Sequence, residues 1–537
     1  MIEIKETKGK IENFFPFDKF RQYQQKILTD IVNDFENGYN VIILEAPVGF
    51  GKSPVNIALG LYYKPAFYTT PQVKLVNQLS RDFCPDKLAI DGGYGNIISL
   101  LGRRNYICKE TKKPSDICPY RKGVPDIDER GFSFERKCSR MNECTYWIQK
   151  KAALSADITI ITFAMLVINS YLNFFGKREI LIVDECHNLE NQVANLFAGF
   201  KIGPNVLPKS IKTEEKKKYW KDINEILPTS NRFSDYIEFF HKFKNIMRNL
   251  RPLCNNEREK DKIDNLRRKV RNMFNEVEEK RTWVIDIPYN DSRSRIFKPI
   301  FIDNFLKKHI WNQGEKIILS SATIPFRQNP TRWLERLGLN EKKFKFHSVP
   351  MSFPVENRPI FISHMGKKMT YSEEKKNWTY NMNIVKNIIK KHIGENGVIH
   401  TQSYERAKRV FFELKKFSCY LHNGNEKNII NEWIQSKKFI LISPSIKDGV
   451  DLKDDLCRFQ ILLKIPYPNI KDSRVKYLLN EKHDWAWYNE ETRRDIVQMY
   501  GRAIRSPTDY AAFYIIDGSF NSLTIANFPK WFLDALK

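Results

Sequence analysis

The stretch NVIILEAPVGFGKSPVNIALGLYY, at residues 40–63, constrains the fold of this chain most. It begins with an apolar run, continues through a loop containing Gly49 and Gly51, and ends in a second apolar segment. This order predicts a buried strand, a tight loop and a helix, which is the context of a phosphate-binding loop. The backbone N–H groups of such a loop and the N-terminus of the helix hold phosphates. The alternative is an ordinary strand–turn–helix with no ligand.

The loop departs in one place from the usual pattern G-x-x-x-x-G-K-S/T, because Ala46 replaces the first glycine. Lys52 would reach the β- and γ-phosphates of a nucleotide, and the Ser53 hydroxyl would bind Mg²⁺. Pro54 is tolerated because the first helical turn does not need its N–H. The predicted contacts to the nucleotide come from the whole loop: Ala46, Pro47, Val48, Gly49, Phe50, Gly51, Lys52 and Ser53.

A second apolar run, EILIVDECHNLE at residues 179–190, ends in two adjacent carboxylates. It predicts a buried parallel strand with Asp184 and Glu185 at its carboxyl end. A carboxylate in this place can bind Mg²⁺, and a second one beside it can orient an attacking water. We assign the first role to Asp184 and the second to Glu185. This pattern gains its specificity from being paired with the phosphate loop.

Two later segments add candidate residues to the phosphate loop and the two carboxylates. KIILSSATIP at 316–325 places Ser-Ala-Thr after a third buried strand, and DIVQMYGRAIRS at 495–506 predicts a helix that carries Gln498. Arg502 and Arg505 are three residues apart, so they project from one helical face. Two guanidinium groups suit the charge that develops on a γ-phosphate, although in isolation two such arginines more commonly form a solvated basic face.

These motifs, in this order, resemble the iron–sulfur helicases of superfamily 2, the XPD/DinG group, from about residue 17 to the C-terminus. The phosphate loop of that group begins with EAP, so Ala46 is normal for it. VDECHN matches its D-E-A-H box with Cys186 in place of alanine, and QMYGRAIR matches its Q-x-x-G-R-x-x-R motif. Val48 and Phe50 stand where the group usually has threonines, and backbone contacts to the phosphates make this departure tolerable.

The resemblance adds further residues to the expected nucleotide site. SPSIKDGVDLKDD at 443–455 is similar to motif V of the group, which implies roles for Gly449 and Asp451. IPYPN at 465–469 is similar to the stretch that follows it. RQYQ at 21–24 is similar to the element that recognises adenine, and Arg21 and Gln24 are the matching positions.

Four cysteines lie close together in the gap between the phosphate loop and the D-E-C-H box: Cys108, Cys118, Cys138 and Cys144. Four thiolates can hold zinc or an iron–sulfur cluster, and the spacing, which contains no C-x-x-C, leaves both open as well as unliganded thiols. The resemblance implies a 4Fe–4S cluster, because the group carries its cluster domain in this gap. The aromatic residues of this insertion are candidates either to stack on bases or to pack its core: Tyr106, Tyr120, Phe132, Phe134, Tyr146 and Trp147.

A second gap separates the D-E-C-H box from the Ser-Ala-Thr motif. Residues 234–282 contain two helical stretches, and apolar residues recur in the second at a spacing of three to four: Ile263, Leu266, Val270, Met273 and Val277. No catalytic pattern is visible there. The resemblance implies a helical arch under which single-stranded DNA passes.

Beyond residue 346, strands and helices alternate, which predicts a parallel sheet. The expected fold is α/β, with two RecA-like motor domains and, inserted in the first, a four-cysteine iron–sulfur domain and a helical arch. The expected boundaries are 1–99, 151–204 and 283–345 for the first motor domain, 100–150 for the iron–sulfur domain, 205–282 for the arch and 346–537 for the second motor domain.

The net charge and the distribution of apolar residues limit the kinds of partner and the location that we expect for this protein. The net charge of +26, from 89 Lys and Arg against 63 Asp and Glu, favours binding to polyanions, although a lysine-rich proteome would have the same composition. No apolar run approaches the roughly 18 to 20 residues that span a bilayer. The N-terminal MIEIKETKGK lacks the apolar core of a signal peptide, so a cytoplasmic protein is expected.

The sequence therefore predicts an ATP-dependent DNA helicase that uses ATP, Mg²⁺ and a 4Fe–4S cluster. We expect a monomer that acts on single-stranded and tailed duplex DNA in repair or replication, with 5'→3' polarity by resemblance. One alternative is a nucleic-acid-stimulated translocase that remodels nucleoprotein, or RNA-containing duplexes, without processive unwinding. Another is a structural binder with an inactive motor, which is disfavoured because the main motor residues are intact: Lys52, Asp184, Glu185, Arg502 and Arg505.

Overall fold

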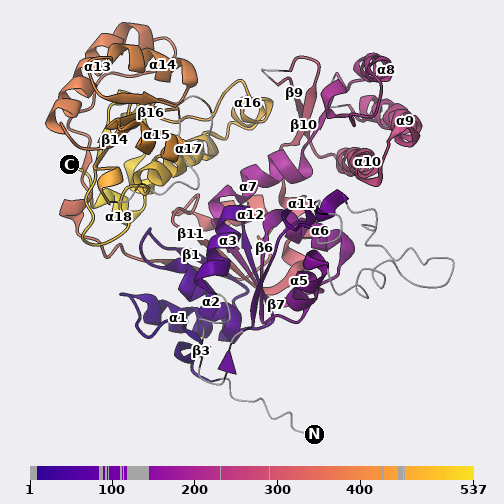
Figure 1. The fold of residues 1–537 in the computed structure, drawn as a ribbon, viewed down its shortest axis with the longest axis horizontal. Coiled ribbons are helices and arrows are strands. Elements are labelled where there is room, and N and C mark those ends of the chain that lie inside the picture. The colour runs from indigo at the N-terminus through magenta and orange to yellow at the C-terminus, as the bar shows by residue number, and fades with distance from the viewer. Residues whose placement is uncertain are drawn as a thin grey trace.

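Two parallel sheets flanked by helices, and a separate helical unit, make up the computed structural model of the chain (Figure 1). The structure describes residues 9–83, 89–90, 93–94, 96–108, 112, 114–117, 144–229, 232–288, 291–422, 424, 429–444, 452 and 454–537. No helix in these ranges has the length and apolar character needed to cross a membrane.

The first sheet carries the predicted phosphate loop. Its described strands run in parallel in the order β12-β1-β11-β7-β2-β6-β5. The strands are β1 (Val41–Glu45), β2 (Ala66–Thr70), β5 (Ile97–Leu100), β6 (Ile158–Thr162), β7 (Arg178–Asp184), β11 (Gly314–Ser321) and β12 (Phe344–Ser348). Because β1, β11 and β7 are neighbours, the three motifs that follow them meet at one edge of the sheet.

Helices cover both faces of this sheet, and β1 shows why. Val41 and Ile43 point into one apolar core, whereas Ile42 and Leu44 point into the other, as the two-residue period of a strand requires. The flanking helices are α1 (Gln24–Glu36), α2 (Lys52–Tyr62), α3 (Val73–Asp82), α5 (Thr145–Leu154), α6 (Phe163–Leu172), α11 (Asp303–His309) and α12 (Pro330–Leu337).

The second sheet forms the core of the C-terminal part, coloured orange to yellow in Figure 1. Its described strands are also parallel, in the order β13-β18-β17-β14-β16-β15. They are β13 (Ile360–Phe361), β14 (Gly397–His400), β15 (Cys419–Leu421), β16 (Ile440–Ser443), β17 (Phe459–Leu462) and β18 (Ala512–Ile515). The helices are α13 (Glu374–Lys391), α14 (Tyr404–Glu413), α15 (Ile429–Ser436), α16 (Ser473–Asn480), α17 (Trp485–Tyr500) and α18 (Lys530–Leu533).

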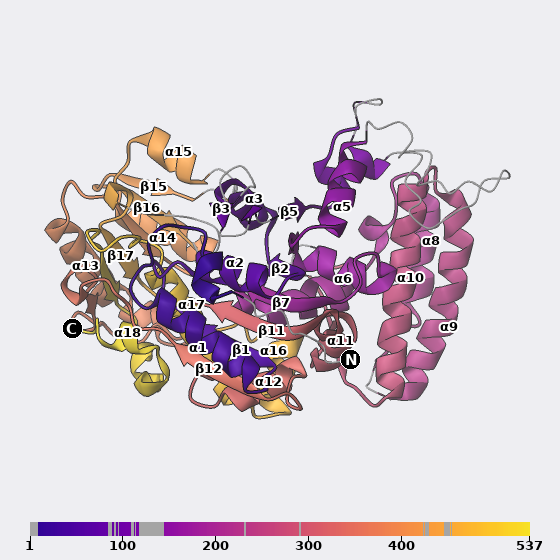
Figure 2. The ribbon, with the colours of Figure 1, turned by 90° about the horizontal axis from the view of Figure 1, so that it is seen from below.

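The helical unit stands to one side of the first sheet, with its three helices side by side (Figure 2). α8 (Thr213–Asn224), α9 (Phe233–Leu250) and α10 (Glu257–Glu278) pack with an antiparallel sheet of β8 (Phe200–Ile202), β10 (Arg295–Pro299) and β9 (Trp283–Asp286). The apolar stripe predicted on the second helical stretch lies in the core of this unit: Ile263, Leu266, Val270, Met273 and Val277 are all buried.

The structure moves several expected boundaries. The helical unit extends beyond 205–282, because β8 and β10 complete the sheet on which its helices pack, and α8 was not foreseen. β12 continues the first motor domain past residue 345, since it pairs with β1. β5 belongs to the first sheet as well, so the expected cut after residue 99 falls within a strand.

Candidate active site between the two motor domains

A cleft of about 500 Å³ opens where the carboxyl ends of the first sheet face α17 of the second motor domain. The first domain contributes Arg21, the phosphate loop and the two carboxylates, and the second contributes the end of α17 and the segment after it. α17 ends at Tyr500 with Gly501 as its C-cap, so Arg502 and Arg505 lie beyond the helix and not on one helical face as predicted. The predicted residues that line the cleft are Arg21, Pro47, Val48, Gly49, Gly51, Lys52, Ser53, Asp184, Glu185, Gln498, Arg502 and Arg505. The cleft is also lined by residues of α3 that the sequence did not point to: Lys74, Leu75, Gln78 and Leu79.

Three predicted contact residues do not line this cleft. Ala46 and Phe50 are buried in the apolar core beneath the loop, so they support its backbone from behind. Gln24 is also buried, and its Nε2 donates to the carbonyl of Phe50 at 2.8 Å. These three residues therefore shape the loop, whereas Arg21 is the member of the RQYQ element that faces the cleft.

The conformation of the phosphate loop depends on two glycines in the left-handed region. Gly49 has a φ of 84° and Gly51 a φ of 83°. A Cβ on Gly49 would lie 2.0 Å from the ring of Phe353, and Arg21 Nη1 donates to the carbonyl of Gly49 at 2.7 Å. α2 begins directly after, at Lys52. The left-handed glycines thus set the turn of the loop, and the side chains of Arg21 and Phe353 hold it in place.

Asp184 is buried at the end of β7 and is held by two hydrogen bonds. The hydroxyl of Tyr68 donates to its Oδ2 at 3.0 Å, and the N–H of Glu185 donates to its Oδ1 at 3.0 Å. Burial, and then the charge of Glu185, raise the pKa of Asp184 to about 6, although Lys52 acts in the opposite direction. A divalent cation beside this carboxyl would favour its charged form, so its surroundings fit the proposed Mg²⁺ ligand.

Glu185 has the opposite electrostatic balance. Burial by itself would raise its pKa, but the charges of Lys52, His187, Arg502 and Arg505 together lower it below its usual value. Its backbone is left-handed, with a φ of 52°, and its Oε2 lies 3.2 Å from His187 Nδ1. A charged, oriented carboxylate in the cleft can accept a proton from water.

A chain of hydrogen bonds leads from the D-E-C-H box to the second motor domain. His187 Nδ1 lies 2.6 Å from Ser321 Oγ, and that oxygen also accepts from the N–H of Thr323 at 3.2 Å. Thr323 Oγ1 accepts from Gln498 Nε2 at 2.9 Å, and Gln498 Oε1 accepts from Arg502 at 3.3 Å. The predicted Ser-Ala-Thr motif therefore connects the two halves of the cleft.

Sequence reasoning missed two supports of the site. Glu45 is fully buried at the end of β1, where it accepts from Arg327 at 3.1 Å and from Ser348 Oγ at 2.7 Å. Glu45 is the first residue of the EAP stretch. A carboxylate directly after a buried apolar strand could have indicated that it needs a buried partner. The second is Tyr68, whose hydroxyl contacts Asp184. Its sequence neighbourhood, PAFYTT, gives no indication of this contact.

Some predicted residues lie outside the described part of the chain: Gly449 and Asp451 of motif V, Cys118 and Cys138, and the aromatic candidates Tyr120, Phe132 and Phe134. The other two cysteines, Cys108 and Cys144, are half-buried. Their neighbours are hydrogen-bonded, since Thr145 Oγ1 donates to the carbonyl of Ile107 at 3.1 Å. Within the described residues, no three His, Cys, Asp or Glu side chains are grouped so that they could hold a metal ion.

The described aromatic residues near these cysteines are buried or half-buried. Tyr106 and Tyr146 meet edge to face with their ring centroids 5.4 Å apart, and both pack against the core of the first motor domain. Trp147 has Lys150 Nζ 4.9 Å from its ring centroid. Packing is thus the observed role of the two tyrosines.

Two parallel α/β domains with a phosphate loop on one and paired arginines on the other define a RecA-like motor ATPase of the helicase type. Two family models match the chain: DEAD_2 over residues 103–206, and the helicase C-terminal domain over 385–535. A probable ATP-dependent helicase of Methanocaldococcus jannaschii is 22% identical, and the match covers 96% of this chain and 94% of that protein. The ATP-dependent DNA helicase XPD of Sulfolobus acidocaldarius is 20% identical over 94% of this chain and 97% of that protein.

Solved structures agree on the fold. An XPD helicase structure is 17% identical and matches with a TM-score of 0.66, covering 96% of this chain and 98% of that one. The structure of Xpd4 of S. tokodaii matches with a TM-score of 0.59 at 15% identity, over 95% and 99% of the two chains. Over almost its whole length the chain resembles the XPD-type helicases of superfamily 2, and these matches support an ATP-dependent helicase that uses ATP and Mg²⁺.

Proposed function

We propose that this helicase hydrolyses ATP in the cleft between its motor domains, moves 5'→3' along single-stranded DNA and unwinds duplex DNA. The observation that carries the proposal is the composition of the cleft. Lys52 and the carboxylates come from one domain, whereas Arg502 and Arg505 come from the other, so that ATP would hold the two together. Closure with ATP and reopening after hydrolysis would move one domain relative to the other.

Each residue has a role that its position supports. Lys52 and the loop backbone bind the β- and γ-phosphates, and Ser53 and Asp184 bind Mg²⁺. Glu185, whose pKa is lowered, takes a proton from the attacking water. Arg502 and Arg505 stabilise the charge that develops on the γ-phosphate. Arg21, which lines the cleft, would contact the adenine, and Gln24 holds the loop from behind.

The proposal of a DNA strand threaded through the protein rests on the helical unit and the cysteine insertion. Arg258 of α10 lies 3.4 Å from Asp116 of the insertion, which supports a passage bounded by both. We therefore assign the helical unit to the arch of the family. The net charge of +26 favours contacts with a phosphate backbone, and the 5'→3' direction comes from the family resemblance alone.

We also propose that Cys108, Cys118, Cys138 and Cys144 hold a 4Fe–4S cluster, which would fix the shape of the insertion beside the strand-separating edge. The support is the family resemblance and the contact between the neighbours of Cys108 and Cys144, which brings the two ends of the insertion together. A structural zinc site is the alternative that the four thiols leave open.

Strand displacement with matched substrates tests the main proposal. We expect ATP-dependent opening of a DNA duplex with a 5' single-stranded tail, little opening with a 3' tail, and none with Glu185→Gln. Equal opening of both duplexes would contradict the threading direction. ATP hydrolysis stimulated by single-stranded DNA, without any displacement, would favour the translocase instead. The same assay with an RNA strand in the duplex tests the other alternative. Faster opening of that duplex would favour a helicase for RNA-containing substrates. Action in repair or replication, a monomeric state and a cytoplasmic location stay predictions.

A further inference from the structure

The hairpin of α16 and α17 belongs to the second motor domain by sequence, but it packs into the core of the first. Val475, Leu478, Leu479 and Trp487 are buried in the same apolar cluster as residues of β1, β7 and β11. An interface of this kind resembles the inside of a domain more than a surface that separates in each catalytic cycle.

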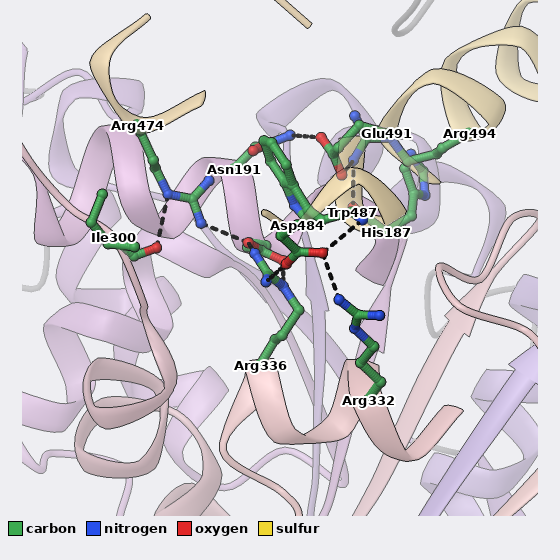
Figure 3. A network of polar contacts seen from close by, with 11 residues as sticks. His187, Asn191, Ile300, Arg332, Arg336, Arg474, Asp484, Trp487, Glu491 and Arg494 are labelled. Carbon is green, nitrogen blue, oxygen red and sulfur yellow. Dashed lines mark hydrogen bonds and ion pairs between the residues drawn. The ribbon is translucent and has the colours of Figure 1, made fainter. Parts of the chain in front are cut away.

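A buried network of charges adds to this apolar contact (Figure 3). Glu190 follows the D-E-C-H box in α7 (Leu189–Gln192). Its Oε1 accepts from Arg336 Nη2 of the first domain at 2.6 Å and from Arg474 Nη2 of the second domain at 2.6 Å. The guanidinium groups of Arg336 and Arg474 hold the pKa of Glu190 at about 2, against the effect of burial.

Asp484 is the counterpart of Glu190 on the second domain. It accepts from Arg332 at 2.6 Å and from Arg336 Nη1 at 3.0 Å, both of which lie on α12 of the first domain. The same carboxylate caps α17 by accepting from the N–H of Trp487 at 3.0 Å. The start of α17 is thereby fixed to the first motor domain.

The other end of α17 carries the cleft residues. The helix has 16 residues, so it spans about 24 Å at the usual rise of ~1.5 Å per residue. Gln498 lies on it, and Arg502 and Arg505 follow in the next turns of the chain. The helix is therefore fixed to the first domain at its start, and the segment that follows its other end places Arg502 and Arg505 in the cleft.

The hairpin also contacts the base of the helical unit. The N–H of Ser473 donates to Asp286 Oδ1 of β9 at 2.8 Å, and Lys298 of β10 bridges Asp286 and Asp472. Arg474 Nε donates to the carbonyl of Ile300 at 3.0 Å. The start of α16 is thus joined both to the helical unit and to the first motor domain.

We propose that Glu190, Arg336, Arg474 and Asp484 form a pivot that keeps the two motor domains joined throughout the ATPase cycle, and that they position Arg502 and Arg505 through α17. The second domain rotates about this pivot, and the cleft opens and closes at the far end of the helix. The four are positioning residues, since the lining of the ATP cleft does not include them. The inference rests on the proposed ATP site.

Hydrogen exchange of the full chain tests the pivot. We compare the nucleotide-free protein with the protein in Mg²⁺, ADP and beryllium fluoride. The peptides over 473–480 and 189–192 are expected to change their exchange by less than about threefold, whereas those over the phosphate loop become protected. A larger change in either direction at the pivot peptides would show that this interface opens, and the proposal would be wrong.

Kinetics tests the positioning role. Glu190→Gln and Arg474→Gln remove the same bridge from opposite domains, and each should lower the kcat of ATP hydrolysis about tenfold while the KM for ATP changes less than about threefold. The double variant should lose less than the product of the two single losses, because both changes break the Glu190–Arg474 bridge and each also removes one further contact. Asp303→Asn is the matched control, as it breaks the bidentate pair with Arg281 away from α17.

The outcomes separate this inference from the proposed function. A wild-type kcat in both single variants, or an equal loss in Asp303→Asn, would overturn the positioning role. Lys52→Ala reports on the ATP site by itself. If Lys52→Ala is inactive and the pivot variants are normal, the pivot fails and the ATP site stands. If Lys52→Ala retains activity, the ATP site fails.

Discussion

Gln498 Nε2 donates to Thr323 Oγ1 at 2.9 Å, and this hydrogen bond joins the two motor domains beside the ATP cleft. Thr323 belongs to the chain that begins at His187, and Gln498 contacts Arg502. A change in the position of His187 can therefore be transmitted to the second domain through a few hydrogen-bonded side chains.

Removing this bond should weaken the cooperation of the two domains. Thr323→Val keeps the shape of the side chain and loses the acceptor, so we expect kcat for ATP hydrolysis to fall about tenfold with a smaller change in KM. Thr370→Val is the control, since its hydroxyl bonds Glu373 on the surface of the second domain. Equal rates for wild type and Thr323→Val would exclude a role of this contact in hydrolysis.

The chemical step depends on Lys52 and Glu185. Lys52→Ala and Glu185→Gln should each lower ATP turnover by a thousandfold or more, about the effect of losing charge stabilisation on a transferring phosphoryl group. Binding of single-stranded DNA, measured by fluorescence anisotropy, should persist because both side chains lie in the nucleotide cleft. Near-normal turnover in either variant would contradict the assignment of the site.

The cluster prediction concerns colour and iron. Protein purified without oxygen should be brown and contain about four irons per chain. Cys108→Ser and Cys144→Ser should lose both properties, and unwinding with them. Cys254→Ser is the control, since that cysteine is buried in the core of the helical unit. A colourless protein with one zinc per chain would show that the thiols serve a zinc site instead.

Glu190 predicts a dependence of stability on pH. Its folded pKa of about 2 lies below that of a free glutamate, so its charge stabilises the fold fully above pH ~4.5 and loses this effect as the pH falls towards 2. The shift corresponds to about 3 kcal/mol. The difference in melting temperature between wild type and Glu190→Gln should stay constant from pH 7 to 5 and shrink below. A difference that grows in acid would contradict the ion pairs at the pivot.

The sequence was sufficient for the two-sheet motor fold and for most of the residues that line its cleft, because local patterns determine them. A buried strand followed by EAPVGFGKS specifies both the fold of the loop and its chemistry, and the apolar stripe of Val270 and Met273 specified the helix that is found. The pivot could not be predicted. Glu190 and Arg474 are 284 residues apart, and nothing in the neighbourhood of either one indicates its partner.

The same limit explains the misplacement of Gln24. Its motif indicates a contact with adenine, but the side chain turns under the loop and donates to the carbonyl of Phe50. Similarly, Phe50 stands in a polar position of the family pattern and is buried among apolar residues of the first domain. Sequence spacing specifies which segment approaches the ligand, whereas the direction of each side chain depends on packing that only the folded chain defines.

The last prediction uses two glycines with the same backbone and different surroundings. Gly38 has a φ of 82° and a Cβ there would meet nothing within 4 Å, whereas a Cβ on Gly49 would lie 2.0 Å from the ring of Phe353. Gly38→Ala should therefore cost only the strain of a left-handed alanine, about 1 kcal/mol, with normal ATP binding. Gly49→Ala must also displace either the ring or the phosphate loop, so the affinity for a fluorescent ATP analogue should fall at least about tenfold. Combining Gly49→Ala with Phe353→Ala removes the clash, and part of the affinity should return. If Gly49→Ala binds ATP as well as Gly38→Ala does, the loop is not held by Phe353 and can shift without loss of function.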